Sequence, residues 1–229
     1  MEWFPLLNSL RISAISTVIT FSLGLLSAHW IARAPRFVKS ILDTVLTLPL
    51  VLPPTVIGFF ILVTVGPKGP VGALIRRWFD YTVTMKWQAS VIAVVIVTFP
   101  LMYRTARGAF ENFDRRLAYA GQTLRLSNTF VFWRIIMPNC RQGILAGTVL
   151  SFARGLGEYG ATSMVSGYIA NRTATISTTV TYYWQTNQEI QAYRWVGLNL
   201  IISFVVMVSV NFLEKRQKSP KPSGRPDTA

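Results

Sequence analysis

The sequence predicts an all-α membrane protein with about five transmembrane helices. Of its 229 residues, 51% are hydrophobic and only 14% are charged, a balance typical of multi-span membrane proteins. Five stretches, four of them clear, approach the roughly 20 apolar residues that a helix needs to cross a bilayer. The basic residues collect in a few loops and in the C-terminal tail.

The first expected span covers residues 12–30 and carries no charge between Arg11 and His29. We interpret it as a retained span, because no basic region precedes it and no small-residue cleavage site follows it, as a signal peptide requires. Small residues along it suit close helix packing in lipid. They are Ser13, Ser16, Thr17, Thr20, Ser22, Gly24 and Ser27.

The second expected span, residues 43–65, contains Pro49, Pro53 and Pro54. Each proline removes a backbone donor and clashes with the preceding turn. Carbonyls freed at membrane depth must be buried in protein or face a wet cavity. Two interpretations stay open: a kinked helix that only packs, or a broken helix that lines a translocation path together with Thr55 and Gly58.

The third expected span covers residues 87–103, and the fourth, residues 142–165, is the least apolar. Arg154 and Glu158 lie four residues apart in the fourth span and so share a helix face. Ionisable groups within a span usually face the bundle interior or a water-filled cavity. Either the two residues pair and hold the bundle together, or Arg154 shapes the field along a path for an anion.

Glycines in the fourth span allow a bend or the close approach of another backbone. The membrane helix could therefore end near Gly160, with residues 161–166 at the outer mouth. Together with the second span, this gives the candidate translocation path. Its residues are Pro49, Pro53, Pro54, Thr55, Gly58, Arg154, Gly157, Glu158 and Thr162.

The fifth expected span covers residues 195–213, so that residues 1–213 form a single transmembrane domain. The basic tail 214–229, rich in proline and serine, is expected to be disordered. Fifteen of the 23 basic residues fall in the tail and in the loops after the first and third spans, and seven fall on the opposite side. Cytoplasmic loops carry the excess of Lys and Arg, which predicts the N-terminus outside and the C-terminus inside.

Several function classes are disfavoured. The single cysteine, Cys140, allows no intrachain disulfide and no paired-cysteine metal site, and His29 is the only histidine. The chain has no catalytic cluster and no Walker motif, so we expect no active site, metal or cofactor on this chain. Nucleic-acid binding is not expected, because the positive charge lies in membrane loops. Trp78, Tyr81 and Trp87 are expected at the outer interface as an aromatic belt.

Residues 114–138 are too polar to span a bilayer and are expected in the cytoplasm. Asp114 can cap a helix that begins at Arg115. Leu117, Ala120, Gly121 and Leu124 would line one face of it. Ser127 and Asn128 can cap a second short helix that Pro138 ends. This pattern fits a helix docked in a partner's groove or one lying on anionic membrane lipid.

The same segment resembles the EAA loop of ABC importer permeases, which has Glu-Ala-Ala, then a glycine, then Ile-x-Leu-Pro. The match falls on Ala118–Gly121, Arg125 and Ile135–Pro138. Ala118 stands in place of the glutamate, Arg125 in place of the glycine and Met137 in place of the leucine. Residues 48–59 (LPLVLPPTVIGF) and 151–167 (SFARGLGEYGATSMVSG) closely resemble the two membrane signatures of molybdate transporter permeases.

This resemblance implies a MetI-like fold and the membrane subunit of a type I ABC importer, a homodimer in the bacterial cytoplasmic (inner) membrane. Each copy would dock one ABC ATPase subunit, which binds ATP and Mg²⁺, and an extracytoplasmic binding protein would deliver molybdate or tungstate. Sulfate, thiosulfate or another small oxyanion is the alternative cargo. A self-contained channel or secondary transporter is disfavoured, because no inverted repeat or chain of intramembrane acids is present. The implied coupling residues are Leu117, Ala118, Ala120, Gly121, Leu124, Arg125, Ile135 and Pro138.

Overall fold

The computed structural model describes residues 3–32 and 34–216, with side chains to residue 208, and this part of the chain is helical without strands. The all-α prediction is thereby confirmed. The helices are α1 (Phe4–Ile31), α2 (Arg36–Val51), α3 (Pro54–Val65), α4 (Pro70–Phe79), α5 (Trp87–Glu111), α6 (Arg115–Thr123), α7 (Asn128–Val131), the π-helical turn η1 (Phe132–Ile136), α8 (Met137–Leu156), α9 (Gly160–Val165), α10 (Ile176–Gln185) and α11 (Glu189–Arg216).

Among the described residues, three helices are long and apolar enough to cross a membrane: α1, α5 and α11. The pair α2 and α3 would make a fourth, although its two halves are bent by 108°. Two of the five expected spans are interrupted in the structure. Residues 43–65 are two helices, and residues 142–165 are α8 and α9 on either side of a break. Arg141 and Arg154 lower the hydropathy of α8, which is not among the candidate spans.

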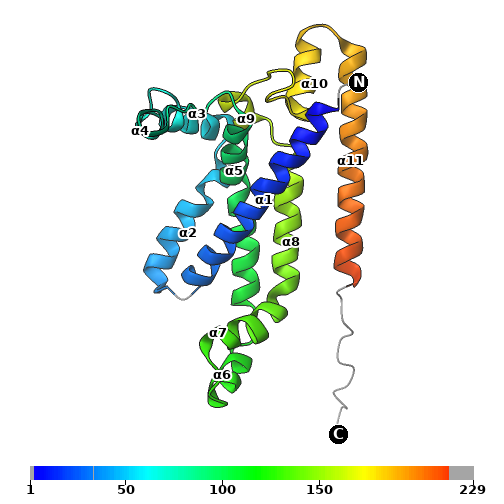
Figure 1. Ribbon diagram of the computed structural model, residues 1–229. Helices are drawn as coiled ribbons and strands as arrows, with labels where there is room; N and C mark the ends of the chain where they lie inside the picture. Colours follow the sequence, from blue (N-terminus) through cyan, green and yellow to red (C-terminus); the bar gives the residue numbers. More distant parts are fainter. Residues whose placement is uncertain (1–2, 33, 217–229) are drawn as a thin grey trace.

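The core of the molecule is α5, with α1 and α8 packed along it (Figure 1). Ser16 of α1 donates to the carbonyl of Val91 at 3.2 Å, and the hydroxyls of Thr20 and Thr98 lie 3.2 Å apart. A Cβ on Gly24 would lie 2.8 Å from Met102, so the helices are in close contact there. The predicted packing through small residues of the first span is confirmed at these positions.

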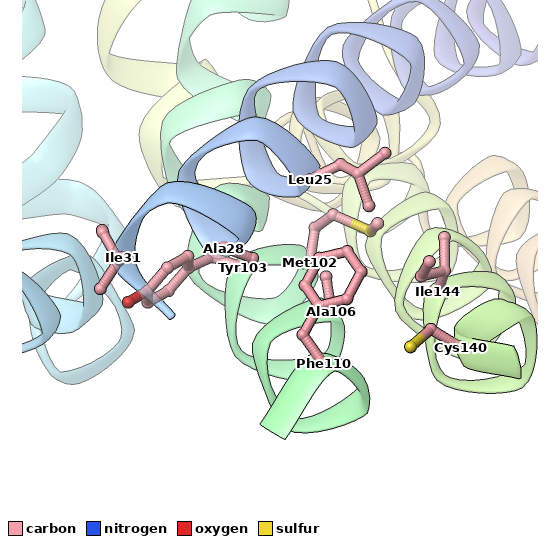
Figure 2. Packing of buried hydrophobic residues seen from close by; sticks show 9 residues of the cluster. All are labelled: Leu25, Ala28, Ile31, Met102, Tyr103, Ala106, Phe110, Cys140 and Ile144. Atoms are coloured by element: carbon pink, nitrogen blue, oxygen red, sulfur yellow. The ribbon is translucent and has the colours of Figure 1, made fainter. Parts of the chain in front are cut away.

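An apolar cluster fills the end of this three-helix core that lies away from the N-terminus (Figure 2). Leu25 and Ala28 come from α1, Met102 and Phe110 from α5, and Ile144 from α8. Because these side chains exclude water from one common centre, α1, α5 and α8 are held as a unit at this end.

The functional elements lie at opposite ends of the molecule. The N-terminus, α3, α4, α9 and α10 lie at one end, and α6, α7 and the turn between α1 and α2 lie at the other (Figure 1). The helix α11 contacts α10 and α8 and continues to Arg216. The first residues of the expected tail, 214–216, are therefore helical, and residues 217–229 lie outside the described part of the chain.

Candidate functional site

The break between α2 and α3 follows from two consecutive prolines. A residue before proline is driven out of the helical region. Leu52 accordingly has ψ 139° and Pro53 has ψ 135°. Pro54 then lies at the start of α3, where its missing N–H costs no helical hydrogen bond. By contrast, Pro49 lies inside α2 and does not interrupt it. Of the two interpretations left open for residues 43–65, the structure shows the break of the helix, and Pro53 and Pro54 cause it.

The short helices α3 and α9 meet where two glycines face the opposite backbone. A Cβ on Gly58 would lie 2.9 Å from both the Cα and the carbonyl oxygen of Ala161. A Cβ on Gly160 would lie 2.9 Å from the Cβ of Pro54 and 3.2 Å from the amide nitrogen of Thr55. Small residues allow such close helix packing in membrane proteins. We call this contact, formed by residues 54–58 and 160–164, the crossing.

The carboxylate of Glu158 ties the end of α8 to the start of α9. Glu158 is 3% exposed. Its Oε1 accepts the amide N–H of Ala161 at 2.9 Å, and its Oε2 lies 2.6 Å from Nη1 of Arg154. The Arg154 side chain is 37% exposed. The interpretation that Arg154 and Glu158 pair is therefore confirmed, and the carboxylate also satisfies a backbone donor of the first turn of α9.

The remaining candidate path residues are not all together. Thr162 is buried, and its hydroxyl donates to the carbonyls of Glu158 and Tyr159 at 3.2 and 3.0 Å. Gly157 is exposed, and a Cβ there would meet no atom within 4 Å. Pro54, Thr55 and Gly58 lie at the crossing, whereas Pro49 belongs to α2. Sequence reasoning missed Ala161, although its place beside Gly160 is typical of a small-residue contact.

At the opposite end, residues 114–136 form the projecting segment, which consists of α6, α7 and η1 (Figure 1). The side chain of Asp114 accepts the amide of Arg116 at 3.0 Å, and Ser127 accepts the amide of Phe130 at 3.2 Å. Both predicted helix starts are confirmed. The side chain of Gln122 donates to that of Asn128 at 3.3 Å and ties α6 to α7.

Arg125 ends α6 in a left-handed conformation, with φ 57°. The amide of Leu126 bonds to the carbonyl of Gly121 at 3.2 Å, and that of Arg125 bonds to Gln122 at 2.9 Å. These two bonds form a Schellman motif, whose left-handed residue is usually glycine. The left-handed conformation at this position explains why the EAA pattern has a glycine there, since glycine adopts it without strain. In this chain Arg125 adopts the same conformation although it carries a side chain.

The helix α6 packs on α7 and η1 through Gly121. Gly121 is buried, and a Cβ there would lie 2.9 Å from Cδ1 of Ile135 and 3.1 Å from Cγ2 of Val131. Leu117, Ala120 and Leu124 are exposed. The four residues expected to share one contact face therefore differ in burial: Gly121 is buried and the other three are exposed. Gly121 is crowded by its own chain, and the two leucines are available to a partner.

Pro138 does not end the second short helix as expected. The chain passes from α7 through η1 into α8 without a break, and Pro138 lies in the first turn of α8. In η1 the amide of Met137 reaches back to the carbonyl of Phe132, five residues earlier. A π-helical turn of this kind accommodates local disruption of the α-helical bonding pattern, which proline causes by lacking an N–H.

Aromatic side chains join the projecting segment to the helical core. The ring centroid of Phe132 lies 4.4 Å from that of His29 on α1 and 6.3 Å from that of Phe110 on α5. Ala118 lines a small cavity with these same two core residues, His29 and Phe110. The turn η1, on which α6 packs, is thus in direct contact with α1 and α5.

Sequence reasoning missed a polar network that joins α2 to α5. Asp43 pairs with Arg107 and accepts the hydroxyl of Tyr103 at 3.0 Å. Glu111 pairs with Lys39, and also with Nε of Arg107 at 3.0 Å. The four-residue spacing on each helix was a visible signal, but it did not show that the two helices face each other. No residue of α2 is fully buried, so this network is an important attachment of α2.

Comparison with known proteins gives three findings. Residues 20–219 match the family described as binding-protein-dependent transport system inner membrane component. The chain is 40% identical over 175 residues to the molybdenum transport system permease protein ModB of Escherichia coli strain K12, covering 76% of each chain. It is 36% identical over 219 residues to ModB of Haemophilus influenzae, covering 95% of this chain and 96% of that one.

The fold also matches a solved transporter. A structure of the MetNI methionine ABC transporter in inward-facing conformations superposes with a TM-score of 0.68 at 12% identity, covering 94% of this chain and 99% of that chain. At this identity the match concerns the fold alone.

Proposed function

The chain belongs to the family of binding-protein-dependent transport system inner membrane components, and on this premise we propose that it carries molybdate as the permease of an ATP-driven importer. Its place is the inner membrane, as a multi-pass permease that is not itself an ATPase. The resemblance to molybdenum permeases extends over most of the chain. Tungstate has the same tetrahedral shape and charge and is included as cargo.

The observation that carries the proposal is the crossing. The two segments that resemble the molybdate signatures, residues 48–59 and 151–167, are about a hundred residues apart in sequence. Their glycines Gly58 and Gly160 bring them into backbone contact. Broken helices at membrane depth are typical of substrate paths, because irregular backbone is tolerated where it lines a cavity. The path therefore runs beside the crossing, and the partly exposed guanidinium of Arg154, which is paired with Glu158, lies next to it.

The proposed orientation has the N-terminus outside and the C-terminus inside, with five membrane-crossing segments. Two features support it. The start of α2, which carries Arg36 and Lys39, and the projecting segment, which is also rich in basic residues, lie at one end of the molecule (Figure 1). The segment α8 packs against both α1 and α5, so its polar residues need not face lipid. We count α2 with α3 as the second membrane span and α8 with α9 as the fourth.

The projecting segment is the proposed contact with the ABC ATPase, which binds ATP and Mg²⁺. Leu117 and Leu124 offer exposed apolar side chains on a short helix, which suits insertion into a groove. Closure of two ATPase subunits would draw together the projecting segments of two permease copies. The aromatic contacts of Phe132 carry this movement to α1 and α5. The ATPase can shift the helical bundle from one conformation to the other only if it binds the two conformations with different affinity.

Two further partners complete the proposed importer. A second copy of the permease would cover part of the apolar surface on α2 and α3, where Val51 and Phe60 are more than half exposed. Membrane lipid covers the rest, including the outer face of α11. An extracytoplasmic binding protein would deliver the anion to the end that holds α9 and α10.

Uptake competition tests the cargo. Cells that lack their own molybdate and sulfate importers would express the permease with its ATPase and binding protein. We expect uptake of radioactive molybdate, strong competition by unlabelled tungstate and weak competition by sulfate. Uptake that sulfate suppresses as well as molybdate does would assign the broader oxyanion class. An absence of ATP-dependent uptake of any oxyanion would refute the proposed function.

A further inference from the structure

Three of the seven basic residues assigned to the outer side converge on one cavity. Arg11 comes from α1, Lys86 from the turn before α5, and Arg172 from the segment before α10. The cavity has a volume of about 400 Å³ and lies at the end of the molecule that holds the N-terminus. We call it the basic pocket. Because positive residues are disfavoured in outer loops, their convergence calls for a reason.

Aromatic rings hold two of the three cations in place. The guanidinium carbon of Arg11 lies 3.7 Å from the ring centroid of Trp87, and Nζ of Lys86 lies 3.4 Å from that of Tyr81. A cation over a ring keeps N–H donors that point away from the ring. Trp87 and Tyr81, expected as an interfacial belt, thus also position positive charge within the molecule.

No carboxylate neutralises this charge among the described residues. Neither the residues that line the pocket nor the ion pairs of the described chain give Arg11, Lys86 or Arg172 an acidic partner. Gln88 also lines the pocket, and its buried amide oxygen has no hydrogen-bond partner in that part of the chain. Rotation of this amide presents N–H donors instead of the oxygen.

The pocket walls are rigid because hydrogen bonds fix the segments that carry them. Asn8, one turn before Arg11, donates to the carbonyl of Ala174 at 2.9 Å. The hydroxyl of Thr173 accepts the amide of Ile169 at 3.0 Å. Three cations that converge on a preformed hollow can donate together to one small anion.

We propose that the basic pocket is a binding site for a tetrahedral oxyanion on the outer face of the permease. There the cargo anion is held by donors from Arg11, Lys86 and Arg172 after it leaves the binding protein. This site is separate from the crossing, and its role rests on the proposed orientation and cargo. A pocket of about 400 Å³ whose cations have no acidic partner among the described residues suits a small anion.

The test is direct binding to the permease without the binding protein. The permease–ATPase complex is placed in nanodiscs of phosphatidylcholine, and binding of radioactive molybdate is measured at equilibrium. We expect saturable binding by the wild type. Loss of one charge-assisted contact in Arg172→Gln or Arg11→Gln raises the Kd about tenfold. Arg172→Lys keeps the charge and is expected to bind within about threefold of the wild type.

Arg77→Gln is the matched control, because Arg77 is a basic residue of α4 at the same end but does not line the pocket. It is expected to bind like the wild type. Equal loss in Arg77→Gln and Arg172→Gln would overturn the proposal, and so would an absence of saturable binding by the wild type. Arg172 is exposed and makes no side-chain hydrogen bond in the described chain, so its variant tests binding even if Arg11→Gln misfolds.

A second arm separates a lipid headgroup from a free anion. Nanodiscs with phosphatidylglycerol are analysed for lipid retained on the complex. Retention by the wild type but not by Arg172→Gln, without molybdate binding, would assign the pocket to lipid and overturn the proposal. Normal cellular uptake without nanodisc binding would refute only the pocket. Failure of all oxyanion uptake would refute the proposed function itself.

Discussion

At the crossing, Gly58 and Gly160 bring two backbones into contact, whereas in the projecting segment Gly121 lets an exposed helix rest on side chains. A backbone cannot move aside without shifting its whole helix, but the end of an isoleucine side chain can change rotamer. The crossing is therefore a rigid junction, whereas in the projecting segment α6 can shift on the side chains of α7 and η1. Such a difference suits a path that keeps its shape and a helix that follows a moving partner.

The largest expected effect is at the crossing. Gly58→Val places three carbon atoms where the Cβ alone would lie 2.9 Å from the backbone of Ala161. Overpacking of this kind destabilises by about 3 kcal/mol, near the upper end of its usual range. We expect loss of molybdate uptake and a melting temperature several degrees lower, measured on the purified permease–ATPase complex.

Gly108→Val is the control, since a Cβ on Gly108 in α5 meets no atom within 4 Å. Gly108→Val changes the intrinsic helix propensity by the same amount as Gly58→Val but creates no steric clash. If Gly58→Val melted no lower than Gly108→Val, the crossing would not be rigid.

The next effect concerns the carboxylate that joins α8 to α9. Arg154→Ala leaves Glu158 buried without its ion pair, and Glu158→Ala also leaves the amide of Ala161 unbonded. Breaking a buried pair costs about 3–5 kcal/mol, and the partial exposure of Arg154 reduces this to about 2 kcal/mol. Both variants should reduce uptake more than Arg76→Ala, a change on the outer helix α4. Equal uptake by Arg154→Ala and Arg76→Ala would remove any special role for Arg154.

A third prediction separates docking from folding in the projecting segment. Leu124 is 74% exposed, so Leu124→Asp should leave the melting temperature unchanged but reduce co-purification of the ATPase at least tenfold. Gly121→Glu should lower both, because its side chain strikes Val131 and Ile135. Thr123→Ala, on the same exposed helix, serves as the control. Undiminished ATPase binding by Leu124→Asp would refute the docking role of this surface.

Local chemistry explains what could be predicted from the sequence. The helix starts at Asp114 and Ser127, the break at Pro53–Pro54 and the pairing of Arg154 with Glu158 depend on neighbours within a few residues. Contacts between distant segments could not be predicted. Nothing in the sequence said that Gly58 meets Ala161 or that Asp43 pairs with Arg107.

Two local expectations failed because tertiary packing decided them. Gly121 could have faced either side of α6, and contact with Val131 and Ile135 determined its direction. Pro138 is usually a helix breaker, but a chain already packed on α5 continued through the π-helical turn η1 instead.

The smallest expected effect is at Arg125, where backbone and side chain make opposite demands. Its left-handed conformation costs an L-residue about 1 kcal/mol, which glycine avoids. Arg125→Gly should therefore slow hydrogen exchange of the α6 amides, measured by mass spectrometry, with Arg116→Gly as the control that lacks positive φ and should exchange faster. If ATPase binding falls while α6 becomes more stable, Arg125 is retained for a contact with the partner. If ATPase binding is unchanged, the projecting segment simply tolerates the strained backbone of Arg125, as the tightly packed crossing would not.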